Sequence, residues 1–247
     1  MNVQLQNLLK SAVHIDTSIL DTVKNCLVIA PHPDDESLGC GGLIANLRKS
    51  GINVHVIFTT DGSMSHPNSQ NTTAISRCKM REQEAVKALQ VLGVAEEYIT
   101  FLRGQDSALP ATGEKGFEGF VAQMIGIITQ VQPGLVLVPY EFDPHRDHRA
   151  SWQITIAALD KHPHIEIWQY LIWLYTLGKK EDVEPLTNIP GGIQYLPMRD
   201  HKKLKKKAIA QHKSQLSLDV FEDPKGFYLK NEVLQNFYGD KEYYIKY

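Results

Sequence analysis

Cysteine is scarce in this sequence. Three cysteines occur among 247 residues, Cys26, Cys40 and Cys78, and no two of them form a CxxC pair. This pattern supports neither a disulfide framework nor a zinc knuckle, and it is typical of a reducing compartment. The N-terminus also lacks a charged stretch followed by a long apolar core, so we expect no signal peptide and a cytoplasmic location.

Long apolar runs and a strong net charge are absent as well. The most apolar segment, Ile165–Gly178, is 14 residues long, whereas a membrane span needs about 20 apolar residues. We therefore expect no membrane span. A formal net charge of −2 gives no electrostatic reason to expect nucleic acid as a partner. Because no internal repeat or low-complexity linker interrupts the chain, we treat residues 1–247 as a single domain.

Short apolar runs alternate with segments of helical character. Strands are predicted at 25–30, 53–60, 97–102 and 135–140, with at least one more within 165–177. Helices are predicted within 1–24 and at 38–50, 74–92, 116–131, 145–161 and 204–216. The segments 61–73 and 103–115 are predicted loops. The alternation of strand and helix favours an α/β fold with a mostly parallel sheet and helices on both faces.

Two polar clusters follow the first and the fourth predicted strands. The sequence PHPDDE, residues 31–36, comes directly after the first strand, and DPHRDH, residues 143–148, follows the fourth. In an open parallel sheet, ligands bind beyond the carboxyl ends of the strands. We therefore expect the two clusters to share a site at one edge of the sheet, although they are far apart in the sequence.

The residue types in these clusters are those of a metal site. His32 and Asp35 are three positions apart, as are His145 and His148, and residues at this spacing lie on one face of a helical turn. Catalytic zinc usually has three ligands from His and carboxylate and an open position for water. His32, Asp35 and one of the later histidines supply such a set. Asp34 is then free to act as a base, and the other histidine faces the substrate.

The sequence resembles the PIG-L/LmbE-like zinc-dependent de-N-acetylases, a family of N-acetylglucosaminyl deacetylase-like enzymes. The resemblance rests on PHPDDE at 31–36 followed by LGCGG at 38–42, and on the HxDH element at 145–148. Weaker matches are an RxxE element at 81–84 and an AxxxHxSQ element at 208–215. The sequence departs from the family at Arg146, where many relatives have proline.

Roles for individual residues follow from the resemblance. It implies that His32, Asp35 and His148 bind zinc, that Asp34 is the general base, and that His145 stabilises the oxyanion or acts as an acid. It implies a three-layer Rossmann-like fold with the metal site at the C-terminal edge of the strands. The expected reaction removes an N-acetyl group from an amino-sugar substrate and gives acetate and a free amine. Such a ligand set also accepts other divalent metals.

Further side chains are candidates for contacts with the substrate. They are Arg81, Asp61, Asp143, Arg146 and His212. The lysines at 202, 203, 205, 206 and 207 are interpreted as a solvated helix face, with an anionic substrate group as the alternative partner. Cys40 is expected to be buried and His66 exposed. Trp168 and Trp173 are expected in the core, although sugars often stack on such rings.

Several alternatives stay open. The leading hypothesis is a hydrolase of linear amides whose partner is a small amino-sugar compound. A deacylase of a non-sugar amide or secondary metabolite is the enzymatic alternative, and an inactive metal-binding relative that serves as a binding module is the other. The glycines of 39–42 lack the GxGxxG spacing of a nucleotide-binding loop. The sequence leaves the formation of a homo-oligomer open.

Overall fold

The structure, a computed structural model, describes residues 2–199 and 201–247. Within them an eight-stranded sheet has the order β1-β7-β8-β6-β5-β2-β3-β4. The strands are β1 Val13–His14, β2 Asn25–Ala30, β3 Asn53–Thr60, β4 Ile99–Gly104, β5 Leu135–Pro139, β6 Glu166–Tyr170, β7 Gln194–Pro197 and β8 Lys241–Lys246. Every pair is parallel except the two that β8 makes, with β6 and β7. The mostly parallel sheet is as predicted.

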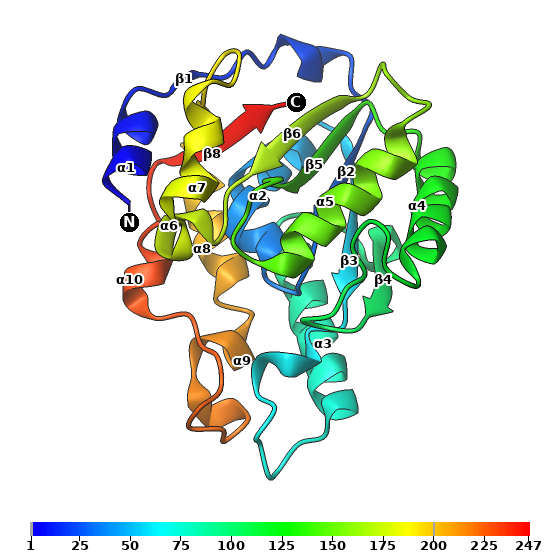
Figure 1. The fold of residues 1–247 in the computed structure, drawn as a ribbon, viewed down its shortest axis with the longest axis vertical. Helices are drawn as coiled ribbons and strands as arrows, with labels where there is room; N and C mark the ends of the chain where they lie inside the picture. Colours follow the sequence, from blue (N-terminus) through cyan, green and yellow to red (C-terminus); the bar gives the residue numbers. More distant parts are fainter. Residues whose placement is uncertain (1, 200) are drawn as a thin grey trace.

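Helices cover both faces of this sheet (Figure 1). They are α1 Val3–Lys10, α2 Asp35–Lys49, α3 Ala74–Val91, α4 Phe117–Val131, α5 Arg146–Leu159, α6 Leu174–Leu177, α7 Lys180–Val183, α8 His201–Ile209, α9 Lys213–Leu216 and α10 Asn231–Leu234. Helices α2, α3 and α8 pack on one face, and α4 and α5 on the other. Within the described residues, every helix is too short or too polar to cross a membrane.

Strand β2 shows why the molecule has three layers. Cys26, Val28 and Ala30 pack into the core beneath α2, whereas Leu27 and Ile29 pack into the core beneath α4 and α5. A strand that is covered on both faces reads as a continuous apolar run rather than an alternating one. The apolar run NCLVIA therefore indicates that β2 lies in the interior of the molecule, with helices on both faces of the sheet.

Three predicted elements have different bounds in the structure. The predicted N-terminal helix is only α1, after which the chain pairs β1 with β7. The predicted strand 97–102 is shifted to β4, because Glu96–Tyr98 form a 3-10 turn. The predicted helix 204–216 is divided into α8 and α9, because the backbone of His212 leaves the helical region (φ −79°, ψ 57°). That break allows the His212 ring to reach Glu36 on α2.

Helix α2 lies unusually close to the sheet because of a glycine. A Cβ atom at Gly39 would lie 2.3 Å from the ring of Tyr170 on β6. Any larger residue here would push α2 away from the strands. The predicted burial of Cys40, the next residue, is confirmed.

Glu242 on β8 connects this strand to both α8 and α2. Lys205 Nζ on α8 lies 2.8 Å from Glu242 Oε1 on β8, and the side chains are 2% and 1% exposed. The Glu242 carboxylate also accepts the backbone N–H groups of Gly42 and Leu43 in α2. The interpretation of the lysine run as a solvated face is therefore wrong for Lys205, because this residue faces inward.

Removing this lysine should destabilise the fold. Lys205→Ala leaves the Glu242 carboxylate buried without its counter-ion, which costs about 3–5 kcal/mol in the free energy of unfolding. Urea denaturation measures this cost. The matched control is Lys202→Ala, because Lys202 pairs with Asp240 at the surface and exposed pairs contribute little. Similar midpoints for the two variants would contradict the prediction.

Candidate metal centre

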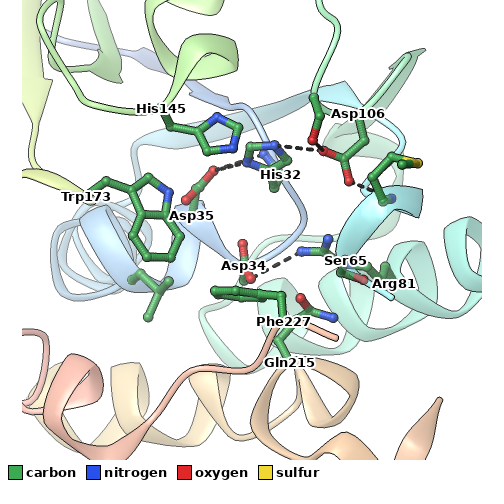
Figure 2. Close-up of a pocket in the computed structure, with 13 residues that line it drawn as sticks. His32, Asp34, Asp35, Ser65, Arg81, Asp106, His145, Trp173, Gln215 and Phe227 are labelled. Atoms are coloured by element: carbon green, nitrogen blue, oxygen red, sulfur yellow. Dashed lines mark hydrogen bonds and ion pairs between the residues drawn. The ribbon is translucent and has the colours of Figure 1, made fainter. Parts of the chain in front are cut away.

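The two polar clusters meet in the structure. Residues 31–36 connect β2 to α2, and residues 143–148 lead from β5 into α5. Because β2 and β5 are parallel neighbours, their carboxyl ends lie side by side and present both clusters at one edge of the sheet. Figure 2 shows His145 beside His32 and Asp35, and these residues line one cavity together with Asp34.

His32 is held from both sides of its ring. Its Nδ1 lies 3.2 Å from Asp35 Oδ2, and its Nε2 lies 3.2 Å from Asp147 Oδ2 and 3.3 Å from Asp106 Oδ1. Both oxygens of Asp147 also accept backbone N–H groups, from Ser107 and Leu109. A proton on Nε2 can be donated to these acids, which leaves the Nδ1 lone pair directed at Asp35.

His148 is fully buried on the far side of Asp35. Its Nε2 lies 3.2 Å from Asp35 Oδ2 and its Nδ1 3.5 Å from Asp143 Oδ1, yet neither ring nitrogen makes a hydrogen bond to the described residues. Burial lowers the pKa of His148, but Asp35 and Asp143 outweigh it and raise the pKa to about 9. The surroundings of this ring therefore strongly favour a positive charge.

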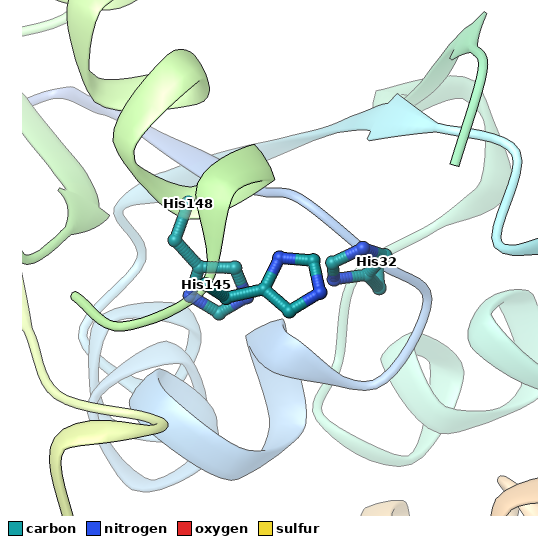
Figure 3. A group of neighbouring side chains, drawn as sticks. All are labelled: His32, His145 and His148. Atoms are coloured by element: carbon teal, nitrogen blue, oxygen red, sulfur yellow. The ribbon is translucent and has the colours of Figure 1, made fainter. Parts of the chain in front are cut away.

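Two groupings of described residues bring three possible ligand atoms within 4.8 Å of one another. One is His32, His145 and His148, whose rings converge in Figure 3. The other is His32, Asp106 and Asp147, which is fully buried and able to bind a metal ion. Asp35 Oδ2 is 3.2 Å from both His32 Nδ1 and His148 Nε2, so the set implied by the resemblance also lies together.

Asp34 lines the cavity and pairs with Arg81. Its Oδ2 lies 3.2 Å from Nη2 of Arg81, and Arg81 also donates to the carbonyl oxygens of Pro33 and Gly62. Burial raises the pKa of Asp34 to about 6, against the lowering effect of Arg81. Arg81 therefore fixes both the carboxylate of Asp34 and the loop that carries it.

His145 is the N-cap residue of α5 and lines the cavity. Its Nδ1 accepts the backbone N–H of Asp147 at 3.2 Å, so the proton of the neutral ring is on Nε2. Burial, together with the charges of His32 and His148, lowers the pKa of His145 to about 4. The side chain is therefore a neutral hydrogen-bond donor at the edge of the cavity.

The cavity has a volume of about 130 Å³. Its lining residues are His32, Asp34, Asp35, Leu38, Met64, Ser65, Arg81, Asp106, Ser107, His145, Trp173, Gln215 and Phe227. Asp106 is not among the candidates from the sequence, although the rule about strand ends would have found it, because it follows β4 by two residues. Nothing in the local sequence of Phe227 indicates its place.

Four of the five candidates for substrate contact do not line the cavity. Asp61 accepts the backbone N–H groups of Ser63 and Asp106, and Asp143 lies behind the His148 ring. Arg146 pairs with Glu114 in solvent, where the two atoms are 2.9 Å apart. His212 Nε2 lies 3.0 Å from Glu36 Oε1 in the interior. Arg81 is the candidate that lines the cavity.

One further expectation is wrong. The sequence predicts an exposed His66, but the structure buries this residue completely, because the segment around Gly226 covers its ring. The sequence also predicts Trp168 and Trp173 in the core. Trp168 is fully buried, and Trp173 packs against the same core but is only partly buried and also lines the cavity.

Comparisons with known proteins identify relatives of this chain. The model of the family described as PIG-L: GlcNAc-PI de-N-acetylase matches residues 27–159. A diacetylchitobiose deacetylase of Thermococcus kodakarensis is 30% identical over 215 residues, which cover 81% of this chain and 73% of that protein. A 1D-myo-inositol 2-acetamido-2-deoxy-alpha-D-glucopyranoside deacetylase of Mycobacteroides abscessus is 27% identical over 201 residues, or 72% and 70% of the two chains.

The fold is shared with a solved structure. The N,N'-diacetylchitobiose deacetylase of Pyrococcus horikoshii, solved with its inhibitor MPG, superposes with a TM-score of 0.67 at 24% identity. The superposition covers 98% of this chain and 90% of that one. The Pyrococcus deacetylase and this chain therefore share the mixed α/β architecture with a mostly parallel sheet.

Proposed function

The chain belongs to the PIG-L family of N-deacetylases, and on this basis we propose that it removes the acetyl group from an N-acetylated amino-sugar substrate with the help of zinc. We further propose that residues 1–247 act as one deacetylase domain. The observation that carries the proposal is the position of Asp34, a buried carboxylate in the cavity beside Asp35 and His32.

We favour His32, Asp35 and His148 as the zinc ligands. Support comes from Asp35 Oδ2, which lies 3.2 Å from a nitrogen of each histidine, and from His148 Nε2, which is buried without a hydrogen bond. Asp147 fits a supporting role better, because both of its oxygens already accept backbone N–H groups and a carboxylate behind a ligand histidine sets its tautomer. A bound divalent ion polarises a carbonyl group and lowers the pKa of water.

The side chains of the cavity can perform the proton transfers of amide hydrolysis. Asp34 accepts a proton from the attacking water as the new bond to the carbonyl carbon forms. The neutral His145 ring donates from Nε2 to the oxygen that becomes negative. Asp34 then returns its proton to the nitrogen as the C–N bond breaks, so the amine leaves in neutral form. The products are acetate and the free amino sugar.

Acetate release from a panel of substrates tests this function. We expect zinc-loaded protein to release acetate from at least one of N-acetylglucosamine, N,N'-diacetylchitobiose and methyl N-acetylglucosaminide, with N-acetylethanolamine as the non-sugar amide. Preference for N-acetylethanolamine would favour the non-sugar alternative. Stoichiometric metal without acetate from any substrate would contradict the proposal and favour a binding module.

A further inference from the structure

The lining of the cavity is chemically mixed. Arg81 and Asp106 contribute charged groups to it, and Trp173 and Phe227 contribute aromatic rings. Figure 2 shows the Phe227 ring lying beneath Asp34 and the indole of Trp173 beside Asp35. The proposed chemistry uses neither ring, so the aromatic rings need their own explanation.

The two rings are fixed against each other. Their centroids are 5.5 Å apart and their planes meet at 76°, an edge-to-face contact of the kind that aromatic pairs prefer. The backbone N–H of Trp173 donates to Asp143 Oδ2 at 3.0 Å. Both residues are only partly buried. The pair is therefore a rigid wall whose exposed surface faces the cavity.

Phe227 reaches the cavity because its segment is tied to the loop after β3. The backbone N–H of Phe227 donates to the carbonyl oxygen of Ser65 at 2.7 Å, and Asn68 N–H donates to Asp223 Oδ2 at 2.9 Å. A Cβ atom at Gly226 would lie 2.1 Å from the buried ring of His66. Gly226 thus allows this segment to lie close to the His66 ring, and this close approach determines where the Phe227 ring lies.

We propose that Trp173 and Phe227 form a wall against which the C–H face of a pyranose ring packs, and that this wall selects cyclic amino-sugar substrates. This inference rests on the proposed function and specifies its substrate. A pyranose carries hydroxyl groups around its edge and C–H groups on its faces. A pocket lined by aromatic rings and a few polar groups matches both.

Trp173 and Phe227 lie beyond residues 27–159, the part of the chain that the family model matches. The position of Phe227 depends on contacts between two parts of the chain, residues 61–73 and the segment that contains Gly226.

Binding of two products by zinc-loaded protein tests the inference without turnover. Methyl glucosaminide carries the sugar ring, whereas acetate occupies only the reacting centre. In calorimetric titrations, we expect Phe227→Ala to raise Kd for methyl glucosaminide about tenfold and to leave Kd for acetate unchanged. Phe227→Tyr, which keeps the ring, should bind like the wild type. Gly226→Ala should weaken binding of the sugar in the same direction, because it displaces Phe227.

The control is Phe142→Ala, which removes a phenylalanine that is 41% exposed and does not line the cavity; it should not change either Kd. The inference fails if the wild type does not bind methyl glucosaminide, if Phe227→Ala binds it as well as the wild type, or if Phe227→Tyr is as weak as Phe227→Ala. A parallel loss of acetate binding would also overturn it. The acetate-release panel tests the proposed function separately, since either experiment can fail while the other succeeds.

Discussion

Replacing Asp34 with asparagine should lower kcat by at least about 100-fold while the bound metal is retained. Asparagine has the size of aspartate and can still accept the hydrogen bond from Arg81, which lies 3.2 Å away. It cannot take a proton from water or return one to the leaving nitrogen. The loss should therefore appear in kcat, measured by acetate release, with metal content determined on the same preparation.

The matched control for Asp34→Asn is Asp61→Asn. Asp61 lies at the same edge of the sheet, but it accepts backbone N–H groups and does not line the cavity. We expect this variant to keep kcat within about threefold of the wild type, because an amide oxygen can still accept those bonds. A kcat for Asp34→Asn close to that of Asp61→Asn would show that Asp34 is not the base.

Replacing His148 with alanine should abolish metal binding. The ring nitrogen that faces Asp35 is buried and makes no hydrogen bond, so its removal takes away one of three proposed ligands. We expect the metal content to fall from about one ion per chain to near zero. Deacetylation should fall by at least about 1,000-fold, because transition-state stabilisation by a metal is worth several kcal/mol.

His145→Ala is the control that separates binding of metal from catalysis. His145 lines the cavity and is proposed to donate to the oxyanion, so the variant should keep its metal and still lose activity. The alternative grouping of His32, Asp106 and Asp147 gives the opposite result. If that grouping binds the metal, His148→Ala should keep the ion and Asp106→Ala should lose it. Such a result would show that the ligand set proposed here is wrong.

The fold from β2 to β6 is predictable because its signals are local. A strand buried on both faces, such as β2, is a short apolar run, and the polar residues that follow it lie at the edge where parallel strands end. The sequence alone therefore places His32 and Asp35 together with residues of 143–148. This placement of polar residues at one sheet edge requires that strands and helices alternate along the chain, as they do from β2 to β6.

The C-terminal third is less predictable because distant contacts decide its structure. The helical segment is interrupted at His212, whose side chain contacts Glu36 on α2. Helix propensity depends on local sequence and therefore does not predict this contact. Lys205 on α8 belongs to a run of lysines that is typical of a solvated surface, but its partner Glu242 is distant in the sequence, on strand β8. The position of Phe227 depends on the close approach of Gly226 to His66 and on the hydrogen bond from Phe227 N–H to Ser65, which are both contacts between distant parts of the chain.

Strand β8 holds two parts of the sheet together. It lies between β6 and β7 and is antiparallel to both. The pair of β1 and β7 is joined to the rest of the described sheet through β8 alone. Loss of residues 241–246 would therefore leave two separate pieces of sheet, each with an unpaired strand edge. Such edges invite pairing with other chains, so a variant without these residues should aggregate.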